Sequence, residues 1–354
     1  MNRKITKYLL MGALFTMGAI TSCTKVGPAG PAGKNGTNGT NGTDGTSGCI
    51  QCHTNSQVLE VKIAQYNTSV HATGGLETET RNNCAVCHTS QGFLETVAAT
   101  PAGGMRPDTT TTGVINDPAP QNCYTCHDIH STYTAADWTN TTTSPVVLWY
   151  GGKTVDFGKG NLCANCHQAR PDNAIPAGVD SVNITSPYWG PHHGPQANVL
   201  GGVGGYEFAG TYAYTNSDHT TKVTDGCVTC HMGTYNGTSG GHNMEMYDKS
   251  GTDSPSAINT TGCVSCHTEG STALVAKITT TQTGVQALLD ALQAAMINKG
   301  IMTSSGSLKT GKYPVAVAGA YWNYDLIEMD HSLGVHNADY VRALLNNSIQ
   351  ALSK

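Results

Sequence analysis

Paired cysteines followed by a histidine form the most informative pattern in the chain. The sequence C-x-x-C-H occurs six times and uses twelve of the thirteen cysteines. Two thiols one helical turn apart can reach both vinyl groups of one porphyrin, and the adjacent imidazole then falls on the iron. The cysteines expected to form thioether bonds are Cys49, Cys52, Cys84, Cys87, Cys123, Cys126, Cys163, Cys166, Cys227, Cys230, Cys263 and Cys266. The expected proximal iron ligands are His53, His88, His127, His167, His231 and His267.

Zinc binding and disulfide formation are the competing uses of paired cysteines. A zinc site does not require a histidine at the same place in six motifs. Disulfides of a secreted chain do not explain the six histidines either. We therefore expect six haem c groups, each with its iron, as the cofactors. The motifs begin 35, 39, 40, 64 and 36 residues apart, which indicates a loose array rather than a strict repeat.

Eight further histidines are available as second axial ligands, since only six of the fourteen follow a cysteine pair. Six haems with two histidines each would use six of them. We favour His71, His130, His193, His219, His242 and His336, with His192 and His331 as alternates. Methionine is the rival ligand and would raise the reduction potential. The methionines near motifs are Met232, Met244 and Met246.

The thirteenth cysteine, Cys23, follows the features of a secretory signal. Basic residues occur within 1–7, and a mostly apolar stretch over 8–20 is too short to span a bilayer. Small residues precede Cys23, and this segment resembles the lipobox of bacterial lipoproteins. The resemblance implies a signal peptide over 1–22, cleavage before Cys23 and lipidation of that residue. An ordinary signal peptide with a coincidental cysteine is the alternative.

A glycine recurs at every third position in the segment 23–48. Only glycine fits the axis of a collagen triple helix, but here the run is short and proline stops after two triplets. We favour a flexible lipid-anchored spacer over a trimerising collagen-like stalk. The glycines of this repeat are Gly27, Gly30, Gly33, Gly36, Gly39, Gly42, Gly45 and Gly48.

Composition limits both the partners and the fold. The net charge is −5, so the basic footprint of a nucleic-acid-binding protein is absent. Only 12% of residues are charged, about half of the usual share, and glycine is abundant. We expect a mostly irregular fold with short α-helices, in which haems fill the core of a domain over 49–270.

Helical patterns are concentrated in the segment 271–354, which has no cysteine. Apolar residues from Val285 to Met296 follow helical spacing, Thr283 with Gln286 resembles a capping box, and Gly300 is a stop signal. Two further helices are expected over 314–330 and after an N-cap at residue 337. We interpret this segment as a helical cap that packs on the haem domain and supplies a distal ligand.

Several short motifs resemble bacterial multihaem c-type cytochromes. They are the six C-x-x-C-H sequences, His-Gly-Pro-Gln at 193–196, Cys-His-Met at 230–232 with a later Gly-His-Asn, and Gly-Val-His-Asn at 334–337. That group includes relatives of the pentahaem nitrite reductases and octahaem hydroxylamine-type enzymes, and the cytochromes of extracellular electron transfer. The resemblance implies stacked and T-shaped haem pairs, mostly with two histidine ligands. The C-x-x-C-K motif of the nitrite reductases is absent from this sequence.

These features predict an electron carrier between respiratory donors and periplasmic or extracellular acceptors. The expected partners are redox proteins or extracellular acceptors and, through Cys23, a membrane, for which the resemblance favours the outer membrane. The location would be the periplasmic face or the cell surface. One alternative is an oxidoreductase that reduces a small nitrogen or sulfur oxyanion at an open haem, although no catalytic residue is assigned. Another is a subunit of a cytochrome filament, and the oligomeric state, including a trimer, stays open.

Overall fold

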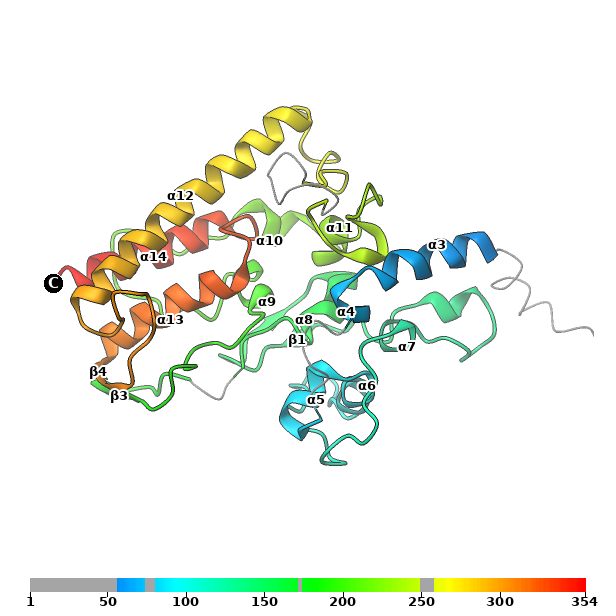
Figure 1. Ribbon diagram of the computed structural model, residues 1–354, viewed down its shortest axis with the longest axis horizontal. Coiled ribbons are helices and arrows are strands. Elements are labelled where there is room, and N and C mark those ends of the chain that lie inside the picture. The colour runs from blue at the N-terminus through cyan, green and yellow to red at the C-terminus, as the bar shows by residue number, and fades with distance from the viewer. Residues whose placement is uncertain (1–55, 74–79, 171–173, 249–257) are drawn as a thin grey trace, which may run out of the picture. The chain divides into compact units, whose positions relative to one another are not determined.

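The computed structural model describes residues 56–73, 80–170, 174–248 and 258–354 (Figure 1). The chain divides into two units, Met1–Thr46 and Ser47–Lys354, and every described residue belongs to the second unit. Several predicted features lie outside the described residues: the signal peptide, the spacer, Cys23, and the first motif with Cys49, Cys52 and His53.

Four of the five described motifs overlap a short α-helix. These helices are α5 (Asn82–His88), α7 (Cys123–Cys126), α8 (Asn161–Ala164) and α11 (Cys227–His231). The last motif forms a helical turn as well, because the backbone N–H of His267 donates to the carbonyl of Cys263 at 2.9 Å. Side chains three residues apart are neighbours on a helical turn. The local backbone therefore presents the two thiols of each motif on one side, as attachment of a haem requires.

The remaining elements before residue 271 are short. The α-helices are α3 (Ser56–Asn67), α4 (Val70–Thr73), α6 (Ser90–Ala98), α9 (Gln196–Leu200) and α10 (Asp218–Lys222). The 3-10 helices are η1 (Ala135–Trp138), η2 (Gly158–Gly160) and η4 (Gly241–Asn243). Long irregular segments connect them (Figure 1). The predicted mostly irregular fold with short helices is confirmed.

Two small antiparallel sheets are the only sheets among the described residues. Strand β1 (Val146–Val147) pairs with β2 (Thr154–Val155). Strand β3 (Ser181–Ile184) pairs with β4 (Gly311–Pro314), with Val182 opposite Tyr313. The second pairing ties the motif-bearing region to the C-terminal segment.

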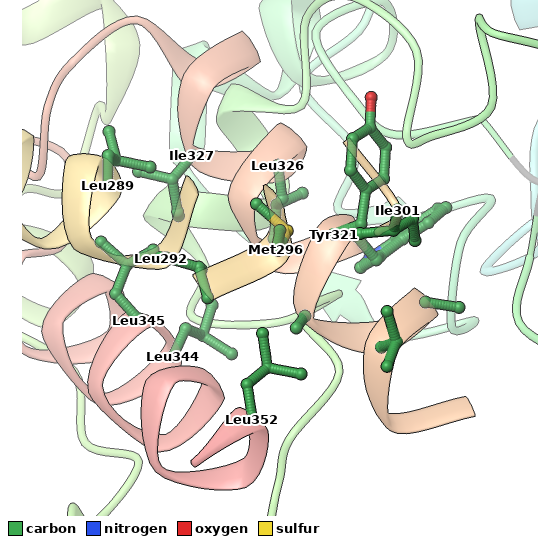
Figure 2. Close-up of a cluster of buried hydrophobic side chains, with 14 of the residues drawn as sticks. Leu289, Leu292, Met296, Ile301, Tyr321, Leu326, Ile327, Leu344, Leu345 and Leu352 are labelled. Atoms are coloured by element: carbon green, nitrogen blue, oxygen red, sulfur yellow. The ribbon is translucent and has the colours of Figure 1, made fainter. Parts of the chain in front are cut away.

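Three longer helices form the C-terminal segment: α12 (Ser271–Asn298), α13 (Val315–Asp330) and α14 (Ala338–Leu352). They pack on one another around fully buried apolar side chains (Figure 2). The centre of this cluster contains Leu289, Leu292, Met296, Trp322, Leu326, Ile327, Leu344 and Leu345. Residues from outside the three helices join it, among them Val182, Trp189, Val199 and Phe208. This core therefore joins the helices to the segment 182–208.

The helix boundaries in this segment match the sequence at most ends. Helix α14 begins after Asn337, whose side chain accepts a hydrogen bond from the N–H of Tyr340, as its prediction as an N-cap requires. Helix α12 ends just before Gly300, which has a φ of 78°. The expected start at Thr283 is wrong, because α12 already begins at Ser271. Leu274 and Ile278 are buried in its first two turns, and their packing extends the helix.

None of the helices in the described part of the chain combines the length and the apolar character that crossing a bilayer demands.

Candidate haem sites

Four of the predicted distal histidines face a proximal histidine of a C-x-x-C-H motif. In each pair the two residues come from distant parts of the sequence. The pairs, with the distance between ring centroids, are His71–His167 at 6.1 Å, His127–His242 at 6.3 Å, His219–His267 at 6.0 Å and His231–His336 at 6.3 Å. The structure therefore brings four proximal ligands together with four different candidates for the second ligand.

The separation of these rings fits an iron between them. An imidazole nitrogen lies about 2 Å from a bound first-row metal, so two rings on opposite sides of one iron have centroids roughly 6 Å apart. All four pairs lie close to this separation, between 6.0 and 6.3 Å, and each joins a motif histidine to a histidine from another segment. These residues would hold four haems with two histidine ligands each.

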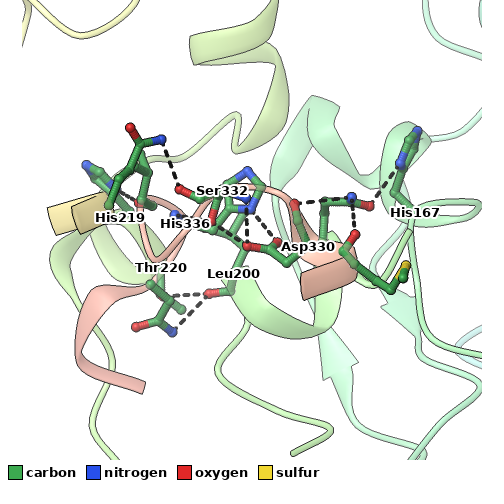
Figure 3. Close-up of polar contacts among 12 residues, drawn as sticks. His167, Leu200, His219, Thr220, Asp330, Ser332 and His336 are labelled. Carbon is green, nitrogen blue, oxygen red and sulfur yellow. Dashed lines mark hydrogen bonds and ion pairs between the residues drawn. The ribbon is translucent and has the colours of Figure 1, made fainter. Parts of the chain in front are cut away.

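Most of the paired imidazoles donate a hydrogen bond from Nδ1. Acceptors that cannot donate fix the proton on Nδ1 and leave Nε2 free for a metal. His127 donates to the backbone carbonyl of Trp138 at 2.9 Å, and His231 donates to that of Met244 at 2.9 Å. His219 donates to the backbone carbonyl of Val335 at 2.7 Å. The other three donate to side chains. His167 donates to Gln196 at 3.1 Å, and His267 donates to Glu269 at 3.2 Å. His336 donates to Asp330 at 2.6 Å. Figure 3 shows the contacts of His167, His219 and His336.

Burial keeps several of these imidazoles neutral. Desolvation lowers the pKa of His71 to about 4 and that of His242 to about 4. It also lowers the pKa of His167 and of His231. The neutral imidazole is the form that binds a metal. His336 differs, because the Asp330 carboxylate outweighs the effect of burial and raises the pKa of this histidine.

Cysteines of different motifs also meet. The thiols of Cys87 and Cys166, of Cys163 and Cys227, and of Cys230 and Cys263 lie close enough that each shifts the pKa of its partner. These pairs connect the motifs 84–88, 163–167, 227–231 and 263–267 in a row. A thioether sulfur is attached at the edge of its porphyrin, so haems bound at these motifs would have neighbouring edges.

The other candidate histidines lie in more exposed positions. The ring of His130 stacks on Tyr133 with centroids 5.5 Å apart. His192 and His193 are adjacent, with ring centroids 5.2 Å apart, and the Nδ1–H of His193 donates to the Met329 sulfur at 3.1 Å. His331 is exposed at the C-terminal end of α13.

A buried arginine that the sequence did not indicate lies between two motifs. Arg106 is 3% exposed, and its guanidinium donates to the carbonyl of Val86 at 3.0 Å and to the carbonyl of Asn165. The same group lies 4.6 Å from the ring centroid of Trp149. Arg106 thus ties the motif 84–88 to the motif 163–167. An isolated arginine has no local pattern, so nothing in the sequence could mark it.

Comparisons with known proteins agree with this chemistry. Residues 29–177 match the family model described as outer membrane cytochrome MtrC/MtrF-like, domains II/IV, and residues 208–354 match that of cytochrome c552. Two Geobacter sulfurreducens proteins are similar to the chain. The C-type polyheme cytochrome OmcB is 28% identical over 60% of this chain and 33% of its own length. The C-type polyheme cytochrome OmcC is 29% identical over 77% of this chain and 43% of its own length.

A solved structure has the same fold. The crystal structure of the outer cell wall cytochrome OcwA matches with a TM-score of 0.51 and 20% identity, over 82% of this chain and 50% of that chain. The family models and the relatives that match are all cytochromes, and OmcB and OmcC are named as polyheme. The chain belongs to the multihaem c-type cytochromes, whose haem is covalently bound. It spans between a third and a half of the length of the curated relatives that it matches.

Proposed function

We propose that the chain transfers electrons through six haem c groups, each iron held by two histidines. The observation that carries this proposal is the set of four histidine pairs with ring centroids 6.0 to 6.3 Å apart. An iron with two protein ligands has no open position for a substrate, and such a haem suits electron transfer rather than bond chemistry. The haems supply the redox chemistry when bound, while the chain sets the ligands, the spacing and the access of solvent.

The remaining two haems take their second ligands from the other candidates. They belong to the motifs 49–53 and 84–88. We assign His130 and His193 to them, in an order that the proposal leaves open, and we keep His192 and His331 as alternates. Under this assignment the six motifs bind six haems through the twelve cysteines named above.

We infer the order of the haems from the proximity of these thiols. It supports 84–88, 163–167, 227–231 and 263–267 as consecutive neighbours. An electrostatic effect of Cys126 on the pKa of the Cys163 thiol supports a place for the motif 123–127 beside this row. Electron transfer slows steeply with the distance between haem edges, so this arrangement supports a continuous route. The row through four motifs with a branch at 123–127 is the path that we propose.

The cell surface is the location that we propose. The similar proteins are named as outer membrane and outer cell wall cytochromes. A signal peptide over 1–22, lipidation of Cys23 and a spacer over 23–48 would tether the haem domain over 49–270 and its helical cap over 271–354 to the outer membrane. The partners would be respiratory electron donors and extracellular acceptors.

A reductase with one open haem is the competing function. It requires an iron without a second protein ligand. The two functions differ in the spin state of the oxidised protein.

Electron paramagnetic resonance of the oxidised protein, combined with haem counting as the pyridine haemochrome, tests the proposal. We expect six haems per chain and ferric signals that are all low-spin, because each iron has two strong-field imidazole ligands. A high-spin ferric signal equivalent to one haem per chain would overturn the proposed ligation and favour the reductase. A count below six would overturn the assignment of a haem to every motif.

A further inference from the structure

His336 differs from the other paired histidines in the group that accepts its Nδ1–H. The acceptor is Oδ1 of Asp330, at 2.6 Å. The Asp330 side chain is fully buried. The hydroxyl and the backbone N–H of Ser332 donate to its other oxygen, Oδ2 (Figure 3). Asp330 ends α13, and His336 directly precedes the N-cap of α14, so two packed helices hold both side chains in place.

Five other paired histidines have an acceptor for this hydrogen bond, and in four of them the acceptor is neutral. Backbone carbonyls accept from His127, His219 and His231, and an amide oxygen accepts from His167. The exception is His267, whose acceptor Glu269 keeps a third of its side chain exposed to solvent. Asp330 therefore supplies a buried carboxylate that these other histidines lack.

A buried carboxylate on the far nitrogen changes what an imidazole offers to a metal. The carboxylate draws the Nδ1 proton toward itself, so the ring gains anionic character and becomes a stronger donor at Nε2. Stronger donation and the nearby negative charge both favour ferric over ferrous iron. Water screens the charge little at a buried site, whereas it screens an exposed carboxylate such as Glu269.

We propose that Asp330 is a positioning residue that holds His336 on the haem of the motif 227–231 and lowers the reduction potential of that haem. This inference rests on the proposed ligation of that iron by His231 and His336. It predicts that this haem, which lies inside the row of four, stays oxidised while its neighbours take up the first electrons.

The haem-loaded full chain with Asp330→Asn tests the inference. Asparagine keeps an acceptor oxygen of nearly the same size and removes the charge. A redox titration followed by electron paramagnetic resonance should show one low-spin component that is easier to reduce, with at least a tenfold larger equilibrium constant for reduction. For a one-electron couple this factor is 59 mV. Glu269→Gln is the same exchange at an exposed site. It should change the equilibrium constant for reduction of the haem held by His267 by less than about threefold.

A second variant tests whether a local loss of order, rather than the lost charge, causes the shift in potential. Ser332→Ala removes a donor to Asp330, so the carboxylate becomes a stronger acceptor and the same haem should become harder to reduce. Shifts in opposite directions support the inference, because a local loss of order would move both variants alike. Shifts in the same direction would overturn it, as would unchanged potentials in Asp330→Asn with all low-spin signals retained.

The proposed ligation is tested separately with His336→Ala. One haem should become high-spin in this variant, and the low-spin component that disappears should be the one whose potential Asp330→Asn shifts. That result supports the assignment to the motif 227–231. Retention of only low-spin haems in His336→Ala would overturn the ligation by His336, whatever Asp330→Asn shows.

Discussion

At the scale of single residues, the sequence predicts which histidines are candidates for ligation but not which motif each one faces. His242 lies close in sequence to the motif 227–231, yet its ring faces His127 of another motif. His71, between the first two motifs, faces His167. The pairs depend on tertiary packing, whereas the C-x-x-C-H spacing is local and visible in any stretch of five residues.

The groups that support the ligands were harder to predict than the ligands themselves. Gln196 belongs to a motif that the sequence had indicated, and it accepts from His167. Asp330 and Arg106 belong to none. Both side chains are buried, and a buried charged group needs compensating contacts. Nothing in the local sequence indicates those contacts. No periodicity or spacing reports such a contact in advance.

His242 offers a test of a single ligand. Its Nδ1 is buried without a hydrogen-bond partner among the described residues, so the pairing rests on the position of the ring alone. We expect His242→Ala to convert one haem of six from low-spin to high-spin, because the iron held by His127 loses its sixth ligand. Electron paramagnetic resonance of the oxidised protein measures this change.

His331→Ala is the matched control, since this exposed histidine is an alternate that the proposed ligand set leaves unused. It should give no new high-spin signal. An unchanged spectrum for His242→Ala, or a high-spin haem in the control, would contradict the proposed pairing.

At the scale of elements, the helices with strong local signals were predicted and the one with weak signals was predicted only in part. The segments 314–330 and 338–352 have apolar spacing and a clear N-cap or a proline at the start. The first turns of α12 are rich in threonine, which has low helix propensity. Burial of Leu274 and Ile278 outweighs that propensity, and packing of this kind is not visible in a local window.

The core of the three C-terminal helices predicts a large effect for one substitution. Leu292 in α12 is fully buried in the cluster that α13 and α14 complete. We expect Leu292→Ala to lower the free energy of unfolding by about 2–5 kcal/mol, because it removes apolar contacts and leaves a cavity. Denaturant unfolding of the haem-loaded protein, followed by far-ultraviolet circular dichroism, measures the difference.

Gly284 on the exposed side of the same helix provides the opposite control. A methyl group there would meet no atom within 4 Å. Gly284→Ala should therefore raise the free energy of unfolding by about 0.5–1 kcal/mol, since alanine restricts the unfolded chain and favours the helix. Equal destabilisation by both substitutions would contradict the packing of α12.

At the scale of the whole molecule, the apolar residues are unevenly distributed. The C-terminal helices share a conventional core with the segment 182–208, while the region of the motifs contains a smaller cluster around Leu148, Phe157 and Leu200. The sequence predicts that haems fill the core of the domain over 49–270, and the apolar cluster of side chains there is indeed small. Haems bound in that region would add apolar surface there, and they bind only the folded chain, which stabilises it.

Anchoring through Cys23 is the prediction that concerns the chain as a whole. Cys23 lies outside the described residues, and the expectation rests on the sequence around it. We expect Cys23→Ala to move the protein from the membrane fraction to the soluble fraction, because the substitution removes the residue that would carry the acyl chains. Haem staining of the two fractions measures the distribution and confirms that the variant still carries its haems.

Deletion of residues 24–48 separates the anchor from the spacer. A chain that keeps Cys23 but lacks the spacer should stay with the membrane, because two or more acyl chains at one residue suffice for stable anchoring. Its reduction by a soluble donor should be unchanged, whereas electron exchange with a bulky insoluble acceptor should slow if the spacer extends the haem domain outward. Membrane retention of Cys23→Ala would contradict lipidation, and release of the spacer deletion would show that the glycine-rich repeat itself binds the membrane.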